Sequence, residues 1–582
     1  MQALRDAGRR AGGGGAIEGP QLLPSPPERT SDYRRKGWWR GETVDALFHK
    51  AVAARAGEEA LADAPNRAAL VGTPPQRLTY AELDRRVDAM AHAFAGLGVG
   101  RGDVVAIQLP NLVEGVLAFL ACARMGAILS PVAMAYRAHE LRQILPSVSP
   151  RLYLTVGAFH GCDHAAMLLE LKAAGVTDAE VVSLGEAPAG AHSLEALMAA
   201  APATPYPTPT DLDAAEALTI CWTSGTEAAP KGVPRHHDHW VVNGEALVEA
   251  AGLGPGDTVL NPFPLINIAA IGGMVMPWIL CQGRLIQHHP FDLPIFLGQM
   301  QDERVAYTVA PPAVLNMLLQ NEALLAAADL SNLRCLGSGS APLSPWMVKG
   351  WQARHGVTVM NVFGSNEGAS LFSTGAAIPD PEQRARFFPR FGAEGLDWPA
   401  VFPSKIRTRL ADPQTGREIT EPGAEGELRI AGAMTFDGYW QAPELTARAF
   451  DEQGYFRTGD LFEIAPEEGG RYYRFVGRCK EIIIRGGQNI SPAELDVLIE
   501  GHPKVREASC AAYPDERLGE RICAVVALRP EQDLTLEELT AHLRAQDIAV
   551  FKLPEKLRIV EALPRNALGK VLRRDLAGVA AS

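Results

Sequence analysis

Short apolar runs typical of buried strands alternate with segments of helical spacing near the start of the chain. Residues 78–87 predict a strand that turns into a helix, and residues 104–109 predict an apolar strand. Residues 114–125 have apolar positions at helical spacing on one face, and residues 127–132 form another strand-like run. This alternation predicts a parallel sheet with helices packed against it, and therefore an α/β fold.

The pattern changes twice further along the chain. Residues 218–222 and 333–336 predict more buried strands. Residues 405–440 instead alternate short β-type runs with glycine and proline turns, which predicts a small β subdomain. The last hundred or so residues return to alternating strands and helices, including a helix over residues 490–500. We therefore expect a large N-terminal region with several subdomains, followed by a smaller α/β unit.

One apolar stretch has the length of a membrane span. Residues 259–283 contain no charged side chain. The stretch also contains Pro262, Pro264 and Pro277 and two adjacent glycines, which a lipid-spanning helix tolerates poorly. We therefore expect no transmembrane segment.

Composition narrows the class of protein. A chain of 582 residues is too long for one hydrophobic core, and 47% hydrophobic and 21% charged residues are ordinary values for a soluble globular protein. The net charge of −13 argues against a nucleic-acid partner or an anionic membrane surface. The 8 cysteines are scattered without a C-x-x-C pair, which indicates neither a disulfide framework nor a zinc site and favours the reducing cytoplasm.

The N-terminus lacks the apolar segment of a secretory signal. Residues 1–32 are rich in glycine and proline, so we predict a disordered segment there. We place the start of the folded chain at residue 33.

The strongest local candidate for chemistry is TSGTEAAPKG, residues 223–232, directly after a predicted strand. Its glycine lets the backbone approach a ligand, and Lys231 adds a positive charge suited to phosphate oxygens. The mononucleotide P-loop has Ser or Thr after its lysine, whereas Gly232 stands here. Taken alone, the stretch fits a phosphate-binding loop and a polar surface turn equally well. Its hydroxyl donors are Thr223, Ser224 and Thr226.

Five more motifs follow this one in a fixed order. They are SGSAPL (338–343), FGSNEG (363–368), YFRTGDL (455–461), GRCKEIIIRGGQNISPAEL (477–495) and PRNALGK (564–570). Together the six resemble the core motifs of the adenylate-forming (AMP-binding) superfamily, which contains acyl-CoA synthetases, adenylation domains of peptide synthetases and firefly-type luciferases. The resemblance extends from about residue 78 to about residue 576, most of the chain.

The resemblance implies a two-domain organisation. It predicts an AMP-binding N-terminal domain over residues 33–477 and a smaller, mobile α/β domain over residues 478–582, with the hinge at Lys480. It also places the uncharged stretch beside the acid substrate, as a buried strand, loop and helix.

The same resemblance assigns a set of nucleotide-binding residues. Asp460 and Arg478 would bind the ribose, Phe363 would stack near the adenine, and Asn366 replaces the usual threonine. Glu367 and Thr226 would hold Mg²⁺, a cation that prefers oxygen ligands. The full set for ATP and AMP is Thr223, Ser224, Gly225, Thr226, Lys231, Ser338, Gly339, Ser340, Ala341, Phe363, Gly364, Ser365, Asn366, Asp460, Arg478 and Lys570.

The resemblance also implies catalytic and acceptor-site residues. The catalytic set is Lys570, Thr226 and Glu367, with Lys570 contacting both the carboxylate and the α-phosphate. The set for the acid and CoA is Asn267, Gly368, Gly486 and Gly487. Asn267 departs from the family, where many members have a histidine. Its amide either hydrogen-bonds the substrate or is a satisfied polar group in a loop.

Three histidines in PRHHDHW, at 236, 237 and 239, suggest a metal site. Adjacent histidines point to different faces of a helix, and no Cys or carboxylate partner is fixed in sequence, which favours a structural role. The resemblance agrees for His237, because the family commonly has a histidine there at a helix start.

The implied reaction joins a carboxylic acid to AMP and then transfers the acyl group to a thiol. ATP, Mg²⁺ and CoA are the expected cofactor and co-substrates. The uncharged lining over residues 266–275 favours a hydrophobic fatty, alicyclic or aryl acid over an amino acid. Parts of the chain, including YRRKGWWRGETV, instead resemble stand-alone enzymes that load aryl acids onto a carrier protein. A non-catalytic nucleotide-binding relative is the third hypothesis, and the sequence leaves open whether the chain is a homodimer.

Overall fold

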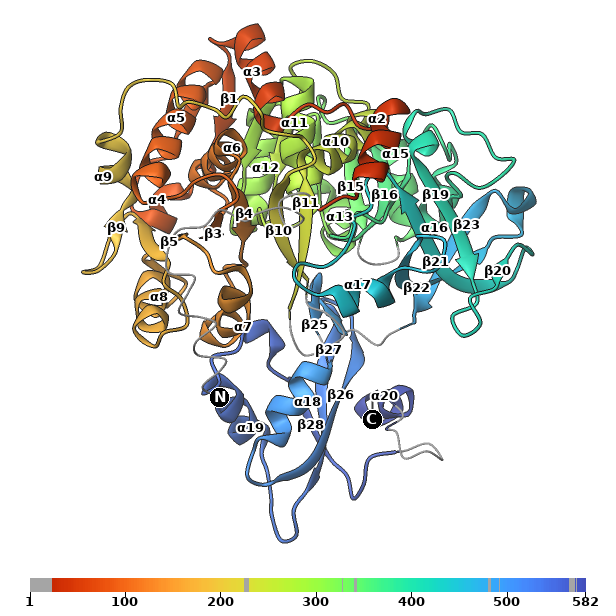
Figure 1. Ribbon diagram of the computed structural model, residues 1–582. Coiled ribbons are helices and arrows are strands. Elements are labelled where there is room, and N and C mark those ends of the chain that lie inside the picture. Colours follow the sequence, from red (N-terminus) through yellow and green to blue (C-terminus); the bar gives the residue numbers. More distant parts are fainter. Residues whose placement is uncertain are drawn as a thin grey trace.

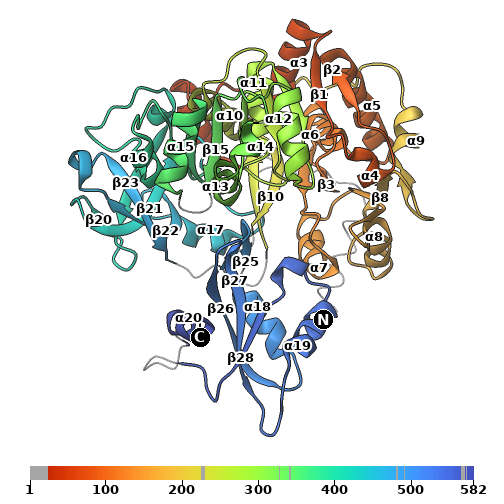
Figure 2. The ribbon, with the colours of Figure 1, turned by 180° about the vertical axis from the view of Figure 1, so that it is seen from behind.

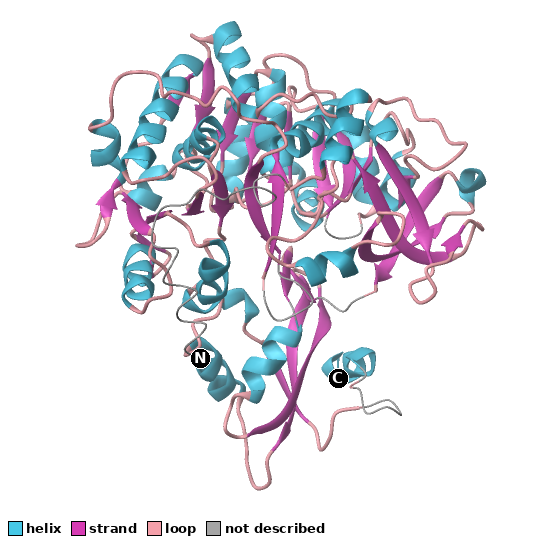
Figure 3. Ribbon diagram, in the orientation of Figure 1, coloured by secondary structure: helices cyan, strands magenta, loops and turns pink. Residues whose placement is uncertain are grey.

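The computed structural model describes residues 24–223, 230–326, 328–339, 343–479, 483–490, 492–564, 571 and 573–581. It has a mixed α/β architecture, with a large body built around three sheets and a smaller unit below it (Figure 1). The reverse view shows the same division (Figure 2), and strands run through both parts (Figure 3). The α/β fold class predicted from the sequence is confirmed.

A seven-stranded sheet has the order β11-β10-β4-β3-β5-β8-β9. All of its neighbouring strands are parallel except β10 and β11. Its strands are β3 (Val104–Gln108), β4 (Ile128–Pro131), β5 (Leu152–Val156), β8 (Glu180–Leu184), β9 (His192–Ser193), β10 (Ala217–Thr223) and β11 (Lys231–His236). Helices α4 (Arg67–Val71), α5 (Tyr80–Gly96), α6 (Val113–Met125), α7 (Ala138–Val148), α8 (His164–Ala173) and α9 (Leu194–Ala199) belong to this half, as does the hairpin β6 (Ala158–Phe159) and β7 (Cys162–Asp163).

Helix α6 corrects one detail of the sequence prediction. Its apolar spacing predicted one buried face, but every residue of the helix is buried. Glu114 on this helix is satisfied by the buried Arg67, whose Nη1 and Nη2 donate hydrogen bonds of 2.8 Å to its carboxylate. Glu114 can therefore lie inside the protein because the paired Arg67 compensates its negative charge.

An eight-stranded sheet has the order β17-β16-β15-β14-β12-β13-β1-β2. Its strands are β1 (Glu59–Ala62), β2 (Arg77–Thr79), β12 (Thr258–Asn261), β13 (Arg284–Gln287), β14 (Tyr307–Val309), β15 (Cys335–Gly339), β16 (Thr358–Gly364) and β17 (Ser370–Ser373). Its helices are α10 (His237–Ala251), α11 (Met276–Cys281), α12 (Leu293–Asp302), α13 (Pro312–Gln320), α14 (Glu322–Ala326), α15 (Pro345–His355) and α16 (Pro381–Arg386).

The uncharged stretch forms β12, a loop, the π-helix η2 (Ile271–Val275) and α11. Most of its large apolar side chains are buried, including Val259, Met274 and Trp278. Among the described residues, no helix is both long enough and apolar enough to cross a membrane.

A six-stranded antiparallel sheet forms the predicted β subdomain, in the order β18-β23-β22-β21-β19-β20. Its strands are β18 (Phe387–Pro389), β19 (Ile406–Ala411), β20 (Glu418–Ile419), β21 (Glu425–Gly432), β22 (Phe456–Ile464) and β23 (Tyr472–Arg478). Helix α17 (Pro443–Ala449) and the short 3-10 turns η3 (Phe402–Lys405) and η4 (Glu467–Gly470) connect or flank them.

The smaller unit has its own sheet and hydrophobic core. It contains β24 (Ile483–Arg485), β25 (Gln488–Ile490), β26 (Val505–Asp515), β27 (Gly519–Leu528) and β28 (Lys556–Ile559), with α18 (Pro492–Glu500), α19 (Leu536–Arg544), η5 (Val550–Lys552) and α20 (Arg573–Ala581). Lys552 joins it to the large body, since its Nζ lies 2.8 Å from Glu494 and 3.3 Å from Glu140 on α7. The domain boundaries given above remain predictions.

The folded chain begins earlier than predicted. Helix α2 (Pro27–Arg35) precedes α3 (Val44–Arg55), so residues 27–32 are helical and not disordered. Arg29 donates hydrogen bonds to Asp437 and to the Gly432 carbonyl, and the Trp39 indole donates one to Ala433. Contacts with distant residues therefore stabilise a segment whose local composition favours disorder.

Candidate active site

Three of the six motifs converge where strands from the two large sheets end. TSGTEAAPKG begins at the end of β10, SGSAPL at the end of β15, and FGSNEG at the end of β16. Strands β15 and β16 are parallel neighbours, so their carboxyl ends lie at the same edge of the sheet. The described part of each motif can therefore face a common ligand.

Asn366 connects these loops through its side-chain amide. Its Oδ1 accepts a hydrogen bond of 2.8 Å from the Ile268 amide, and its Nδ2 donates one of 3.4 Å to the Trp222 carbonyl. The predicted nucleotide-binding asparagine therefore joins FGSNEG to the uncharged stretch and to the strand before the phosphate loop. This bridging role could not be predicted from the sequence, because Ile268 and Trp222 lie 98 and 144 positions away along the chain.

Glu367 is held by the segment that follows β21. Its side chain is buried, and its Oε1 accepts a hydrogen bond of 2.9 Å from the Tyr439 hydroxyl. Its backbone carbonyl accepts another, of 2.8 Å, from Phe436. The ammonium of Lys231 lies 5.2 Å from the centroid of the Tyr439 ring. The structure thus brings together the predicted metal ligand and the predicted phosphate-binding lysine, with Tyr439 in contact with both.

Two predicted glycines allow close backbone packing at the site. Gly368 has φ of +85°, and a Cβ there would meet the Met434 carbonyl oxygen at 1.9 Å. A Cβ on Gly339 would meet the Val362 carbonyl oxygen at 2.0 Å. Neither position has room for a side chain, so both glycines let neighbouring loops approach the site.

The two predicted ribose residues lie on adjacent strands, and the predicted adenine residue, on β16 of another sheet, packs beside them. Asp460 on β22 is directly paired with Arg478 on β23 in the antiparallel register. The ring of Phe363 packs edge-on against Phe462, two positions from Asp460, with centroids 5.2 Å apart. The sheet register and this ring contact together put the predicted contacts for ribose and base near one another.

The side chains of two predicted ligand residues, Ser338 and Asn267, make protein contacts instead. The Ser338 hydroxyl is buried and donates to the Ala310 carbonyl at 2.8 Å. Asn267 Oδ1 accepts from the amides of Ala269 and Ala270, which begins the turn before the π-helix. The Ser365 hydroxyl is buried without a hydrogen-bond partner among the described residues, and Gly364 is the exposed end of β16. Asn267 therefore has a local structural role at the point where a substrate contact was predicted.

Several predicted residues lie outside the described residues. They are Ser224, Gly225, Thr226, Ser340, Ala341, Lys480 and Lys570. Gly486 and Gly487 are described and form the exposed turn between β24 and β25, with φ of +54° and +80°. Their positive φ values explain why glycine suits this turn, and both could lie close to a flexible ligand.

Arg235 is a further charged residue that the sequence analysis did not identify. Its guanidinium is fully buried, lies over the Trp240 ring and donates to the Asn366 carbonyl at 3.1 Å. Burial lowers the pKa of Arg235 to about 10. A buried cation directly behind the Glu367 loop favours anions at this site.

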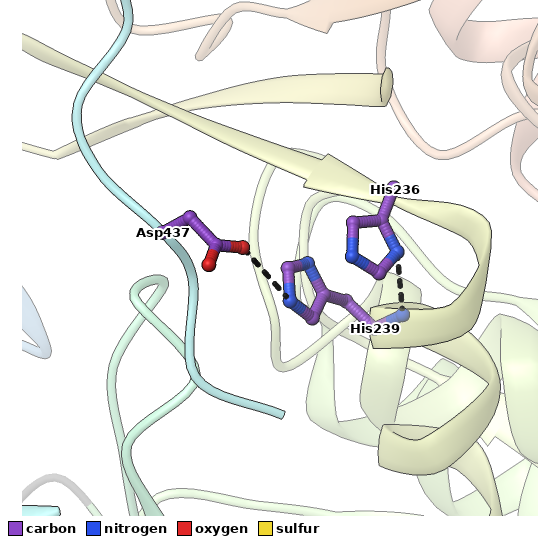
Figure 4. A group of neighbouring side chains, drawn as sticks. All are labelled: His236, His239 and Asp437. Atoms are coloured by element: carbon purple, nitrogen blue, oxygen red, sulfur yellow. Dashed lines mark hydrogen bonds and ion pairs between the residues drawn. The ribbon is translucent and has the colours of Figure 1, made fainter. Parts of the chain in front are cut away.

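His236, His239 and Asp437 form the cluster suggested by the three histidines (Figure 4). Their potential ligand atoms lie within 4.8 Å of one another. The two imidazole rings are stacked, however, with centroids 3.5 Å apart and planes inclined by 17°. Lone pairs in nearly parallel planes cannot both point at one ion, so the stacking opposes a shared metal.

The hydrogen bonds of His236 and Asp437 in this cluster are already assigned, whereas the two ring nitrogens of His239 are buried without a hydrogen-bond partner among the described residues. The amide of His239 donates to His236 Nδ1, and Ser25 Oγ lies 2.9 Å from His236 Nε2 and donates to Asp437. Burial lowers the pKa of His236 well below its usual value, so the ring is neutral. Because Nδ1 accepts the hydrogen bond from the His239 amide, the ring hydrogen lies on Nε2. Arg29 pairs with Asp437 at 2.7 Å. These contacts indicate a structural cluster that anchors α2.

His237 has a separate structural partner. Its Nδ1 accepts a hydrogen bond of 3.0 Å from the Val44 amide at the start of α3. Burial lowers the pKa of His237 to about 4, so the ring is neutral. The histidine predicted at a helix start therefore fixes the N-terminal segment.

Comparisons with known proteins agree with this arrangement. Residues 57–440 match the family described as AMP-binding enzyme, and residues 494–570 match the AMP-binding enzyme C-terminal domain. The medium-chain fatty-acid–CoA ligase of Escherichia coli (strain K12) is 29% identical, over 94% of this chain and 93% of its own length. The salicyl-AMP ligase / salicyl-S-ArCP synthetase of Mycobacterium tuberculosis (strain ATCC 25618 / H37Rv) is 30% identical, over 98% and 96%.

Solved structures match over similar lengths. The apo structure of MbtA from Mycobacterium smegmatis has a TM-score of 0.68 and 28% identity, covering 96% of this chain and 100% of that one. The amide bond synthetase McbA of Marinactinospora thermotolerans has a TM-score of 0.76 at 23% identity and shows the shared fold. The chain belongs to the AMP-binding, adenylate-forming family of ligases.

Proposed function

We propose that this protein activates a hydrophobic carboxylic acid with ATP and transfers the acyl group to CoA. The supporting observation is the hydrogen bond of 2.8 Å from the Ile268 amide to Asn366. It puts the uncharged stretch against the loop that carries Glu367. An acid lying along that stretch would have its carboxylate near the nucleotide and its apolar part among uncharged side chains.

In the first half-reaction a carboxylate oxygen attacks the α-phosphorus of ATP, and pyrophosphate leaves. Both reactants are anions, so the protein must offset their repulsion. Lys231 and the phosphate loop would bind the β- and γ-phosphates, and Asp460 and Arg478 would hold the ribose. Lys570 would contact the carboxylate and the α-phosphate.

Members of this family use ATP with Mg²⁺. A buried carboxylate with an oriented oxygen, as at Glu367, is a donor that Mg²⁺ accepts together with phosphate oxygens and water. Bound there with Thr226 as a second ligand, the ion would supply charge neutralisation at the phosphates. Tyr439 and the Phe436 amide fix the loop that presents the carboxylate.

In the second half-reaction the thiol of CoA attacks the acyl carbon of the adenylate, and AMP leaves. The exposed Gly486–Gly487 turn would lie beside the pantetheine arm after the small domain rotates about Lys480. The fatty-acid–CoA ligase relative supports CoA as the acceptor. The salicyl-S-ArCP synthetase relative supports the alternative, an aryl acid loaded onto the phosphopantetheine thiol of a carrier protein.

The test is a pyrophosphate-release assay over a panel of fatty, alicyclic, aryl and amino acids. In one set of reactions hydroxylamine traps any adenylate as the hydroxamate, and in a second set without hydroxylamine CoA or a phosphopantetheinylated carrier protein is supplied as acceptor. We expect pyrophosphate release with an apolar acid and thioester formation with CoA. Adenylate that reacts only with a carrier would establish the alternative acceptor. Release with amino acids alone would contradict the proposed substrate class.

A further inference from the structure

A short segment of the smaller unit, residues 549–552, docks on helix α7 of the large body. The Ala549 amide donates a hydrogen bond of 3.2 Å to Glu140 Oε1 on that helix. Phe551 is half-buried and packs against two hydrophobic cores, the one that contains Leu141 of α7 and the one inside the smaller unit. The side chain of Lys552 is only 3% exposed, although it lies where the two parts of the molecule meet.

Lys552 bridges carboxylates that belong to different parts of the molecule. Its Nζ lies 2.8 and 3.0 Å from the two oxygens of Glu494 in its own unit, and 3.3 Å from Glu140 Oε1 in the large body. The centroid of the Tyr136 ring, just before α7, is 5.5 Å from the same nitrogen. Burial alone would lower the pKa of Lys552, but Glu494 and Glu140 raise it above its usual value, so the ammonium stays charged.

Glu140 is oriented toward the smaller unit by its own helix. Its Oε2 accepts a hydrogen bond of 2.9 Å from the Arg137 amide at the start of α7, which leaves Oε1 for Ala549 and Lys552. The neighbouring His139 makes a second contact across the boundary, with its Nε2 3.8 Å from Glu494 Oε1. Attraction within a buried ion pair is largely offset by the loss of hydration, so such a contact can fix an orientation and still open when water replaces it.

This contact holds the smaller unit in one particular orientation. Strand β25, which follows the Gly486–Gly487 turn, lies at the end of the unit nearest the large body, and helix α20 lies farther away in both views (Figures 1 and 2). Under the proposed function the glycine turn serves the transfer to the thiol. The orientation therefore suits the second half-reaction.

We propose that Lys552 is a positioning residue that holds the smaller unit on α7 for thioester formation and releases it for adenylation. The inference rests on the proposed function, which requires the small domain to rotate between the two half-reactions. In the docked orientation the ammonium is shared between Glu494 and Glu140. After rotation it keeps Glu494, its partner within the same unit, and Glu140 is hydrated instead.

Two variants remove the bridge from opposite sides of the boundary. Lys552→Met removes the ammonium, and Glu140→Gln removes the negative charge but keeps an oxygen that can accept from the Arg137 amide. Hydrogen–deuterium exchange is followed in a peptide spanning residues 545–553, which contains the Ala549 amide. We expect this amide to exchange about tenfold faster in both variants, as for the loss of one hydrogen bond to a charged group.

The two half-reactions are then measured separately, as ATP–pyrophosphate exchange and as single-turnover thioester formation from preformed adenylate. The acceptor is whichever thiol, that of CoA or of a carrier protein, proves active with the wild-type protein. Both variants should slow thioester formation about tenfold, because its rate follows the population of the docked orientation. ATP–pyrophosphate exchange should be unchanged or faster, whereas a merely structural role would slow both half-reactions equally.

Lys504→Met is the matched control, because Lys504 pairs with Glu538 at 2.9 Å within the smaller unit. It should change neither the hydrogen exchange of Ala549 nor the ratio of the two rates. If Lys552→Met failed to fold, Glu140→Gln would decide alone, since it lies outside the smaller unit.

A double-mutant cycle between Lys552→Met and Glu140→Gln gives a further criterion, since residues that act through one contact are non-additive. Unchanged hydrogen exchange at Ala549, equal slowing of both half-reactions, or additive effects in the cycle would overturn the inference. If the wild-type protein formed no adenylate with any acid, the proposed function itself would fail, and hydrogen exchange would still test the docking contact.

Discussion

Two polar clusters meet at the segment that carries Asp437 and Tyr439, and they differ in how their charges are compensated. Asp437 faces Arg29, Ser25 and stacked histidines, so a full positive charge from the protein neutralises it. Glu367 instead receives a neutral phenol hydroxyl. By composition the first cluster looks more like a metal site. By its contacts it is a structural anchor, and the second is the one suited to a cation and phosphates.

Matched carboxylate-to-amide substitutions should separate the two clusters. Glu367→Gln keeps an acceptor for Tyr439 but loses the charge that would bind Mg²⁺. We expect kcat/KM for adenylation to fall about 10²–10³-fold, or about 3–4 kcal/mol. Urea unfolding should show a stability change below about 1 kcal/mol. If Glu367→Gln lowered the free energy of unfolding and left the activity unchanged, Glu367 would have a structural role like that of Asp437.

Asp437→Asn should have the opposite profile. It leaves Arg29 opposite a neutral amide in a largely buried position, because the Asp437 side chain is only 7% exposed. We expect a loss of about 2–3 kcal/mol in the free energy of unfolding, reduced by the partial exposure of Arg29. Exchange activity of the folded fraction should stay within a few-fold of wild type. An activity loss as large as that of Glu367→Gln would contradict a purely structural role for the Asp437 cluster.

Acid should weaken the histidine cluster. Burial holds the pKa values of His236 and His239 well below the usual 6.5, so the unfolded chain binds more protons than the folded one below that pH. The contribution of these neutral histidines to stability is therefore complete above pH 6.5. As the pH falls below that value, the free energy of unfolding decreases by up to about 1.4 kcal/mol per pH unit for each histidine. Burial also raises the pKa of Asp437, so above its usual pKa of 3.8 the folded chain binds more protons at this carboxyl than the unfolded chain does. This group therefore changes the free energy of unfolding with pH in the opposite direction to the histidines.

Thermal unfolding between pH 7 and 5 measures this slope. Substituting His236 by Gln and His239 by Asn together should reduce the slope but not abolish it. His237 is also buried, with its pKa lowered to about 4, so it also makes the free energy of unfolding decrease as the pH falls. A slope that the double variant leaves unchanged would contradict the assignment of neutral, buried rings.

The smallest expected effect is that of added zinc. Because the stacked rings and Arg29 oppose a shared ion, Zn²⁺ should not raise the melting temperature, and EDTA should not lower it. A His239→Ala variant provides the control. A zinc-dependent rise that this variant abolishes would show that the cluster binds metal.

The sequence predicted those features that depend on local patterns. The strands before TSGTEAAPKG and SGSAPL and the β subdomain follow from periodicity and turn residues, and the buried strand, loop and helix of the uncharged stretch follow from the family resemblance. It missed features that depend on distant contacts. Tyr439 reaches Glu367 across 72 positions, and Asn366 reaches Trp222 across 144. Residues 27–32 of helix α2 fall in the segment predicted to be disordered, because the contact that stabilises them reaches 408 positions along the chain, from Arg29 to Asp437.

The most direct test of the account follows one oxygen atom. An apolar acid found active in the panel is labelled with oxygen-18 in its carboxylate, incubated with enzyme, ATP, Mg²⁺ and CoA, and the products are analysed by mass spectrometry. Attack of the carboxylate on the α-phosphorus predicts that AMP carries one labelled oxygen and that pyrophosphate carries none. Thioester formation with unlabelled AMP, or with label in another phosphate product, would contradict an acyl-adenylate intermediate.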